Sequence, residues 1–115
     1  MANTFKNASI KSVSHSGFVD LYTCPSATTA IVLGLAITNK TDNSVTASVQ
    51  FIDSSASGSA ADKERLLLNE VSIPANTTLE VLSGQKYVME TTDILKVKAG
   101  TTTSLDAVLG LMQIT

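Results

Sequence analysis

The chain has 115 residues, of which 43% are hydrophobic, and a formal net charge of −2 at pH 7. This length suits a single domain with its own core. Positive and negative residues are interspersed without a basic stripe, so no nucleic-acid partner is expected. A single cysteine cannot form an intramolecular disulfide, which suits folding in a reducing cytoplasm.

The first 17 residues are polar, with isolated apolar positions at Phe5, Ile10 and Val13. They lack the apolar centre of a signal peptide, and no other apolar run is long enough to span a bilayer, so no membrane partner is expected. A turn at 14–17 ends the stretch. We expect residues 1–17 to form an extended N-terminal arm or an edge strand, followed by a β-sandwich domain over 18–115.

The clearest strand pattern follows a first short strand at 18–24 and covers residues 28–39. Its large apolar residues share one face, which we expect to meet the core: Ile31, Leu33, Leu35 and Ile37. The opposite face carries small residues that suit close packing against another element or another subunit. Residues 45–52 also alternate, and the polar turn between the two runs predicts an antiparallel hairpin.

Residues 54–61 form a small polar loop of low complexity. The next residues favour either a helical turn capped by Asp62 or a strand. Alternation through Leu66, Leu68, Val71 and Ile73 favours the strand, with Asn69 marking a bulge.

Four further strands are predicted at 79–82, 86–90, 94–99 and 104–115, separated by turns rich in Gly, Pro, Asn and Thr. In the third of these, Leu95, Val97 and Ala99 should point inward while the two lysines point outward. Strands at this regular spacing predict an all-β fold, an antiparallel β-sandwich that is Ig-like or jelly-roll-like, with about seven or eight strands.

Candidate chemistry is sparse. His15 and Cys24 are the sole histidine and cysteine, and their settings in a polar turn and at a strand end favour a solvated histidine and a buried thiol over a catalytic pair. No acidic pair has a spacing suited to acid–base work, and one histidine with one cysteine cannot make a conventional zinc site. The oxygens of 42–44 and 53–55 suit turns better than calcium. We therefore predict no catalytic, cofactor or metal residues, and no enzyme activity.

Surface contact is the remaining route to function. Extended arms and exposed strand edges associate by adding to a neighbour's sheet, although a free arm end can also simply fray. The candidate interface residues come from the arm and from the small-residue face of 28–39: Thr4, Phe5, Ile10, Val13, Ala30, Val32 and Ala36.

Several stretches also match a known pattern. They are the opening Met1–Ala8, the runs 21–26, 28–35 and 37–39 in the first half, and the runs 73–79, 93–97 and 104–109 in the second. In their order they resemble a family of small tailed-bacteriophage virion proteins. The resemblance implies a non-enzymatic β-sandwich subunit of the virion, and it carries no catalytic residues.

From this resemblance we expect a bacteriophage structural protein that is synthesised in the bacterial host cytoplasm and resides in the virion. Capsid decoration or cementing, through self-association and docking, is ranked ahead of a neck, collar or tail ring. The expected partners are other copies of the chain and the major capsid protein or neck and tail proteins. The alternative is a carbohydrate- or receptor-binding module, for which Tyr22 and Tyr87 are the aromatic candidates.

Overall fold

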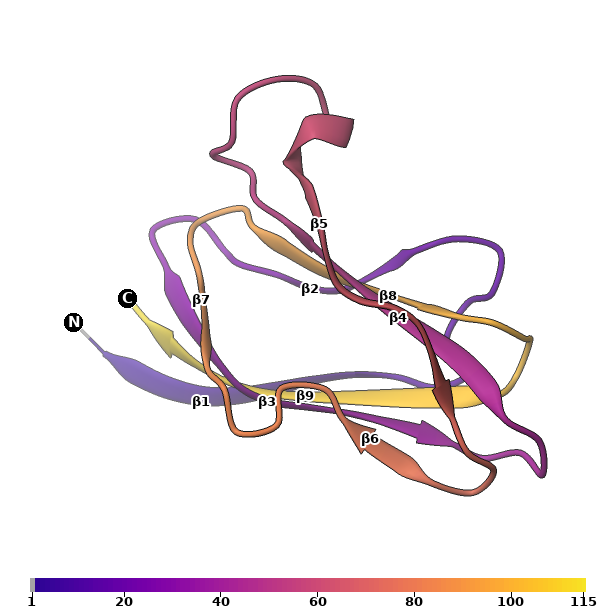
Figure 1. Cartoon of the computed structure of the whole chain (residues 1–115). Coiled ribbons are helices and arrows are strands. Elements are labelled where there is room, and N and C mark those ends of the chain that lie inside the picture. Colours follow the sequence, from indigo (N-terminus) through magenta and orange to yellow (C-terminus); the bar gives the residue numbers. More distant parts are fainter. Residues whose placement is uncertain (1) are drawn as a thin grey trace.

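The computed structural model describes residues 2–115, which form a sandwich of two antiparallel sheets (Figure 1). One sheet contains β1 (Asn3–Ile10), β9 (Leu105–Ile114), β3 (Thr29–Asn39) and two short strands paired to β3, β6 (Thr78–Glu80) and β7 (Tyr87–Met89). The other contains β2 (Val19–Thr23), β8 (Ile94–Ala99), β4 (Val45–Ile52) and β5 (Glu64–Ile73). A search of the described residues for a helix able to cross a membrane finds none.

The strand order identifies the sandwich as a jelly roll. β6 and β7 pair with different parts of β3 and act as one interrupted strand. The pairs then nest: β1 with β9, β2 with β8, β3 with β6 and β7, and β4 with β5. This nesting is the signature of two Greek keys folded into a double-sheet jelly roll. The predicted β-sandwich is confirmed, and its jelly-roll form is the one observed.

The predicted hairpin of β3 and β4 is wrong, because these strands belong to different sheets. The turn between them instead carries the chain across the sandwich. Asn39, which is fully buried, holds this crossing: its side-chain amide donates to the carbonyls of Asn43, Ile73 and Pro74 at 2.8, 2.9 and 3.2 Å. It therefore ties the β3–β4 crossing to the β5–β6 crossing.

The core lies between the sheets and is built from aliphatic side chains. The predicted inward face of β8 is confirmed, since Leu95, Val97 and Ala99 are all buried. On β9 the alternate positions from Leu105 to Leu111 are buried in the same way. Regular alternation holds in these strands because neither contains a bulge at these positions.

The faces of β3 differ from the prediction. A register shift against β9 falls between Val32 and Gly34, so one residue is added and the alternation changes phase. Leu35 and Ile37 are buried as expected, but Leu33 is 39% exposed and Ile31 is only half-buried. Ala30 and Val32, expected on the outer face, are buried instead.

Residues 61–73 combine the two alternatives weighed for this region. A single 3₁₀ turn at Ala61–Lys63 precedes β5. The bulge predicted at Asn69 is confirmed, because Asn69 and Glu70 together lie opposite Ser48 on β4. Leu66 and Val71 are exposed, contrary to the expected inward alternation, because register shifts interrupt β5.

The N-terminal residues form part of the sheet. Residues 3–10 are the edge strand β1, hydrogen-bonded along its length to β9 of the same chain. Beyond it, Ala2 and Thr115 exchange backbone hydrogen bonds, which holds the two chain ends together (Figure 1). Residues 1–17 were expected to form an extended arm or an edge strand, and residues 3–10 form the edge strand. The domain boundary at residue 17 stays a prediction.

Candidate functional site

The outer face of the β1-β9-β3 sheet carries an apolar row. Register places Phe5 beside Met112, Met112 beside Ile31, and Ile31 beside Val88, so the four side chains cross β1, β9, β3 and β7 on one face. The opposite face of these strands holds the core. Phe5 is 75% and Val88 is 58% exposed, while the two central members are half-buried. The apolar row thus crosses the whole width of the sheet, from β7 to the free edge of β1.

Two acidic residues elsewhere on this sheet already have partners. Asp106 accepts hydrogen bonds from the Lys40 ammonium at 2.9 Å and the Ser12 backbone N–H at 2.8 Å. The hydrogen bond from Lys40, followed by that from Ser12, lowers the pKa of Asp106. Glu80 accepts from the backbone N–H of Leu35 at 3.0 Å. A partner surface that covers this face would therefore not leave Asp106 or Glu80 without a hydrogen-bonding partner.

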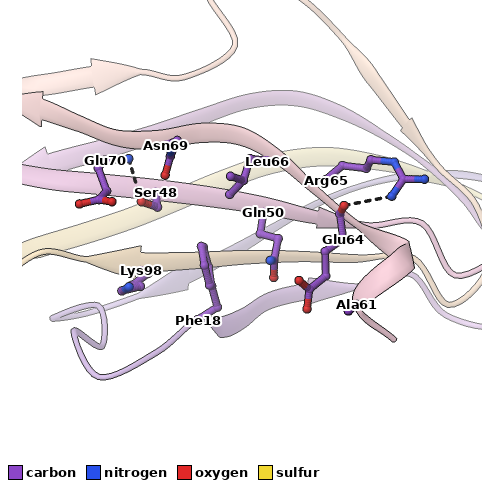
Figure 2. A pocket seen from close by; sticks show the side chains of 10 residues that line it. All are labelled: Phe18, Ser48, Gln50, Ala61, Glu64, Arg65, Leu66, Asn69, Glu70 and Lys98. Carbon is purple, nitrogen blue, oxygen red and sulfur yellow. Dashed lines mark hydrogen bonds between the residues drawn. The ribbon is translucent and has the colours of Figure 1, made fainter. Parts of the chain in front are cut away.

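The outer face of the other sheet carries a polar groove. Figure 2 shows its lining, which comes from β4, β5, β8 and the residue before β2. The hollow measures about 450 Å³, and a smaller one of about 220 Å³ shares part of its lining and extends toward His15. The side chains that define the polar groove are Phe18, Ser48, Gln50, Glu64, Glu70 and Lys98.

The walls of the polar groove combine an aromatic ring with both signs of charge. The Lys98 ammonium lies 5.7 Å from the centroid of the Phe18 ring, within cation–π range. The bulge in β5 turns the Glu70 backbone N–H toward β4, where it donates to the Ser48 hydroxyl at 2.9 Å. Arg65 points away and donates to the backbone oxygens of Asp62 and Glu64 (Figure 2).

The residues predicted as interface fall into two groups. Thr4 and Phe5 are exposed on β1, and Ile10 and Ala36 are half-buried, so these four keep surface that a partner can reach. The other three are core residues of this chain, which corrects the expectation that they face a neighbour: Val13 (2% exposed), Ala30 (0%) and Val32 (2%). The bulge in β3 accounts for the last two.

The histidine and cysteine are not brought together. His15 is exposed before β2, whereas Cys24 follows β2 at the other end of the strand. The Cys24 thiol is buried, donates to the carbonyls of Thr28 and Met89, and has a pKa raised by desolvation. A buried thiol with a raised pKa is a poor nucleophile. The expected buried thiol and solvated histidine describe what is observed.

The short acidic turns act as turns. Asp53 accepts from the backbone N–H and the hydroxyl of Ser55 at 3.3 and 2.8 Å, the pattern of an Asx turn. Asp42 accepts from the side chain of Asn76 at 3.2 Å. Within residues 2–115, no three His, Cys, Asp or Glu side chains gather in a way that could hold a metal ion.

Two features of the site lay beyond sequence reasoning. Ser48 and Gln50 lie on the outer face of β4, and their burial there was not predicted. Asp93, read as part of a turn, is 2% exposed and accepts hydrogen bonds from Ser54 and Glu90. Single polar residues in a Ser- and Thr-rich chain give no signal that distinguishes such buried positions from ordinary turns.

Comparison with known proteins gives a likeness of fold. Neither a protein-family model nor a curated protein sequence matches the chain. A chain from the structure of infectious bursal disease virus, Gx strain, superposes with a TM-score of 0.58 at 13% identity, covering 96% of this chain and 32% of that one. The present chain therefore spans about a third of the viral chain's length.

Two other solved structures match over most of both chains. One comes from the disulfide-linked pili of Bacillus endospore appendages, with a TM-score of 0.54, 9% identity, and coverage of 98% of this chain and 88% of that one. The other comes from the acid-stable capsid of Helicobacter pylori bacteriophage KHP30, with a TM-score of 0.50, 13% identity, and coverage of 99% and 89%. At these identities the likeness establishes a shared jelly-roll-like fold.

Proposed function

We propose that this chain is a non-enzymatic structural protein of a bacteriophage virion, and that it decorates or cements the capsid through contacts between copies and with the shell. The observation that carries the proposal is the apolar row of Phe5, Met112, Ile31 and Val88, which stands exposed on one face of a jelly roll. Exposed apolar patches of this kind mark protein–protein contacts. The same fold in a chain from a virus structure and in a chain from a bacteriophage capsid structure adds support.

The occupant of the apolar row in this proposal is a second copy of the chain. The row ends at β1, whose outer edge has no partner strand among the described residues. A two-fold axis beside β1 would bring two Phe5 side chains together and pair the free edges, so that the contact is self-complementary.

The mechanism first expected, strand addition by a free arm, is replaced by contact through an edge strand. β1 already fills the place beside β9, so a free arm would require β1 to leave its own sheet. The contact proposed here uses the open side of β1 and leaves the fold intact. Deleting residues 1–13 would therefore expose β9 and would not test the interface cleanly.

A pilus subunit is the rival that the fold comparison raises, since the Bacillus structure is of disulfide-linked pili. A covalent link of that kind requires an accessible thiol. Cys24 is 1% exposed and lies under the β2–β3 connection, so it cannot reach a neighbour without local unfolding. This observation favours the capsid role over a disulfide-linked fibre.

The proposal is tested on purified particles and on the isolated chain. Mass spectrometry of virions from the source of the sequence should find the chain in a fixed ratio to the major shell protein. Electron cryomicroscopy should then place it on the capsid surface, which separates decoration from a neck, collar or tail ring. Light scattering should show a symmetric oligomer in solution. A chain that is absent from washed particles would refute the virion role.

A further inference from the structure

The floor of the polar groove holds a side-chain amide that has no protein partner. Gln50 lies on the central strand β4 and is 8% exposed, and its side chain makes no hydrogen bond within the described residues. Among the described residues, every fully enclosed side-chain nitrogen or oxygen atom has a hydrogen-bonding partner. Because the Gln50 amide has none, it keeps some accessibility, and this opens into the hollow. Figure 2 shows it pointing between Phe18 and Glu64. The amide therefore makes no hydrogen bond to the protein and can donate to and accept from a ligand in the hollow.

Ser48 adds a second buried polar group two residues away on the same face. It is 5% exposed, and its oxygen accepts from the Glu70 backbone N–H. That hydrogen bond leaves the hydroxyl proton free to donate. The floor of the groove thus offers an amide with both donor and acceptor and a hydroxyl donor, fixed on a rigid central strand rather than on a loop.

The walls define the chemistry of the ligand. Glu64 and Glu70 offer carboxylate acceptors, Lys98 offers an ammonium donor, and the Phe18 ring gives an apolar surface. Because both signs of charge line the hollow, a strongly charged ligand would meet one repulsive wall. A neutral molecule rich in hydroxyl groups, with C–H faces that pack on an aromatic ring, satisfies every wall. The volume of about 450 Å³ falls within the range of small-molecule sites.

We propose that the polar groove binds a neutral saccharide, with Gln50 and Ser48 hydrogen-bonding its hydroxyls and Phe18 packing against its ring. This site goes beyond the structural role, and it lies on the sheet opposite the apolar row. A particle surface covered with copies of this chain would then present many weak sugar contacts at once. The aromatic candidates expected for such binding, Tyr22 and Tyr87, lie outside the groove, and Tyr22 already accepts a hydrogen bond from Gln113.

The experiment uses the intact, ¹⁵N-labelled chain and a glycan array of neutral saccharides. A hit from the array is titrated while the side-chain amide resonances of Gln50 and Gln85 are followed. We expect the Gln50 resonances to shift saturably and those of Gln85, in an exposed turn outside the groove, to stay unchanged. Gln50→Leu should weaken binding at least about tenfold, the loss expected when one or two buried hydrogen bonds disappear. Gln85→Leu is the matched control.

One further variant keeps the proposal testable. If Gln50→Leu does not fold, Glu64→Gln replaces it, because Glu64 is at an exposed rim position. This variant should weaken binding of the same sugar while the thermal unfolding midpoint stays unchanged. Absence of any array hit, together with unshifted Gln50 resonances at millimolar sugar, would overturn the proposal. So would Gln50 shifts that appear only when unlabelled chain is added, because the groove would then be a contact between copies. Sugar binding that survives loss of particle association would separate this site from the structural role.

Discussion

The two outer faces of this jelly roll differ although their inner faces are alike. Both sheets bury aliphatic side chains toward the common core. Outside, the β1-β9-β3 sheet presents the apolar row, whereas the β2-β8-β4-β5 sheet presents the polar groove with the side-chain amide of Gln50. The contrast underlies the two proposals, that one face contacts protein and that the other binds a small polar ligand.

The largest expected effect comes from making the β1 end of the first face polar. Phe5→Ser should weaken self-association on the order of 10²–10³-fold, because the Phe5 contact is lost from both copies of a two-fold interface beside β1. Sedimentation equilibrium measures the change. Leu66→Ser is the matched control, since Leu66 is 54% exposed on the other face, and it should leave the association constant unchanged. Equal weakening by the control would show that the faces do not differ in this role.

The next prediction concerns the stability of the whole sandwich. Asn39 connects the two chain segments that cross between the sheets. Asn39→Ala would leave the carbonyls of Asn43, Ile73 and Pro74 without their amide donor. We expect the free energy of unfolding to fall by about 3 kcal/mol, measured by urea denaturation. Asn7→Ala, on the exposed side of β1, should change it by less than about 0.5 kcal/mol. A loss below about 1 kcal/mol for the Asn39 variant would contradict this structural role.

A smaller effect is confined to the second face. Glu70 has a φ of 49°, in the left-handed region, at the β5 bulge that shapes the polar groove. Glu70→Gly should raise the free energy of unfolding by about 0.5–1 kcal/mol, because glycine adopts this conformation without a Cβ clash. Glu64→Gly, at a position with φ near −82°, should lower it by a similar amount. The prediction fails if both glycine variants shift unfolding in the same direction.

The smallest effect belongs to the Lys40–Asp106 ion pair, at the other end of β9 from the apolar row. Hydrogen bonds from Lys40 and Ser12 lower the pKa of Asp106. This contribution to stability is complete above the unfolded-state pKa near 3.9 and disappears as the pH falls through the lowered folded-state pKa. Since Asp106 is 40% exposed, solvent screening limits it to about 0.5 kcal/mol. Asp106→Asn should cost that much in urea denaturation at pH 7, and the cost should disappear as the pH falls through the lowered folded-state pKa; a cost independent of pH would exclude the ion pair as its cause.

Much of the fold could be predicted from local patterns. Alternation located β8 and β9 and their buried residues, and turn composition separated the strands. The bulge at Asn69 followed from a break in the alternation of β5. These predictions succeed because a strand with one face in the core imposes a period of two on its own residues.

Partner choice and site assembly could not be predicted in the same way. The phase change at Leu33 moved Ala30 and Val32 into the core, and the polar turn at 39–44 led to the other sheet rather than to a hairpin. Of the candidate interface residues, Phe5 belongs to the apolar row, whereas its neighbours there come from β9, β3 and β7 through pairing alone.

The sequence by itself determined that this protein is an all-β sandwich without an intramolecular disulfide, because composition and periodicity are properties of neighbouring residues. Only the tertiary structure decided that the sandwich is a jelly roll, that residues 3–10 pair within their own chain, and that Gln50 is buried without a hydrogen-bonding partner. Those features depend on which distant strands meet and in what register. A one-residue bulge is enough to exchange the inner and outer faces.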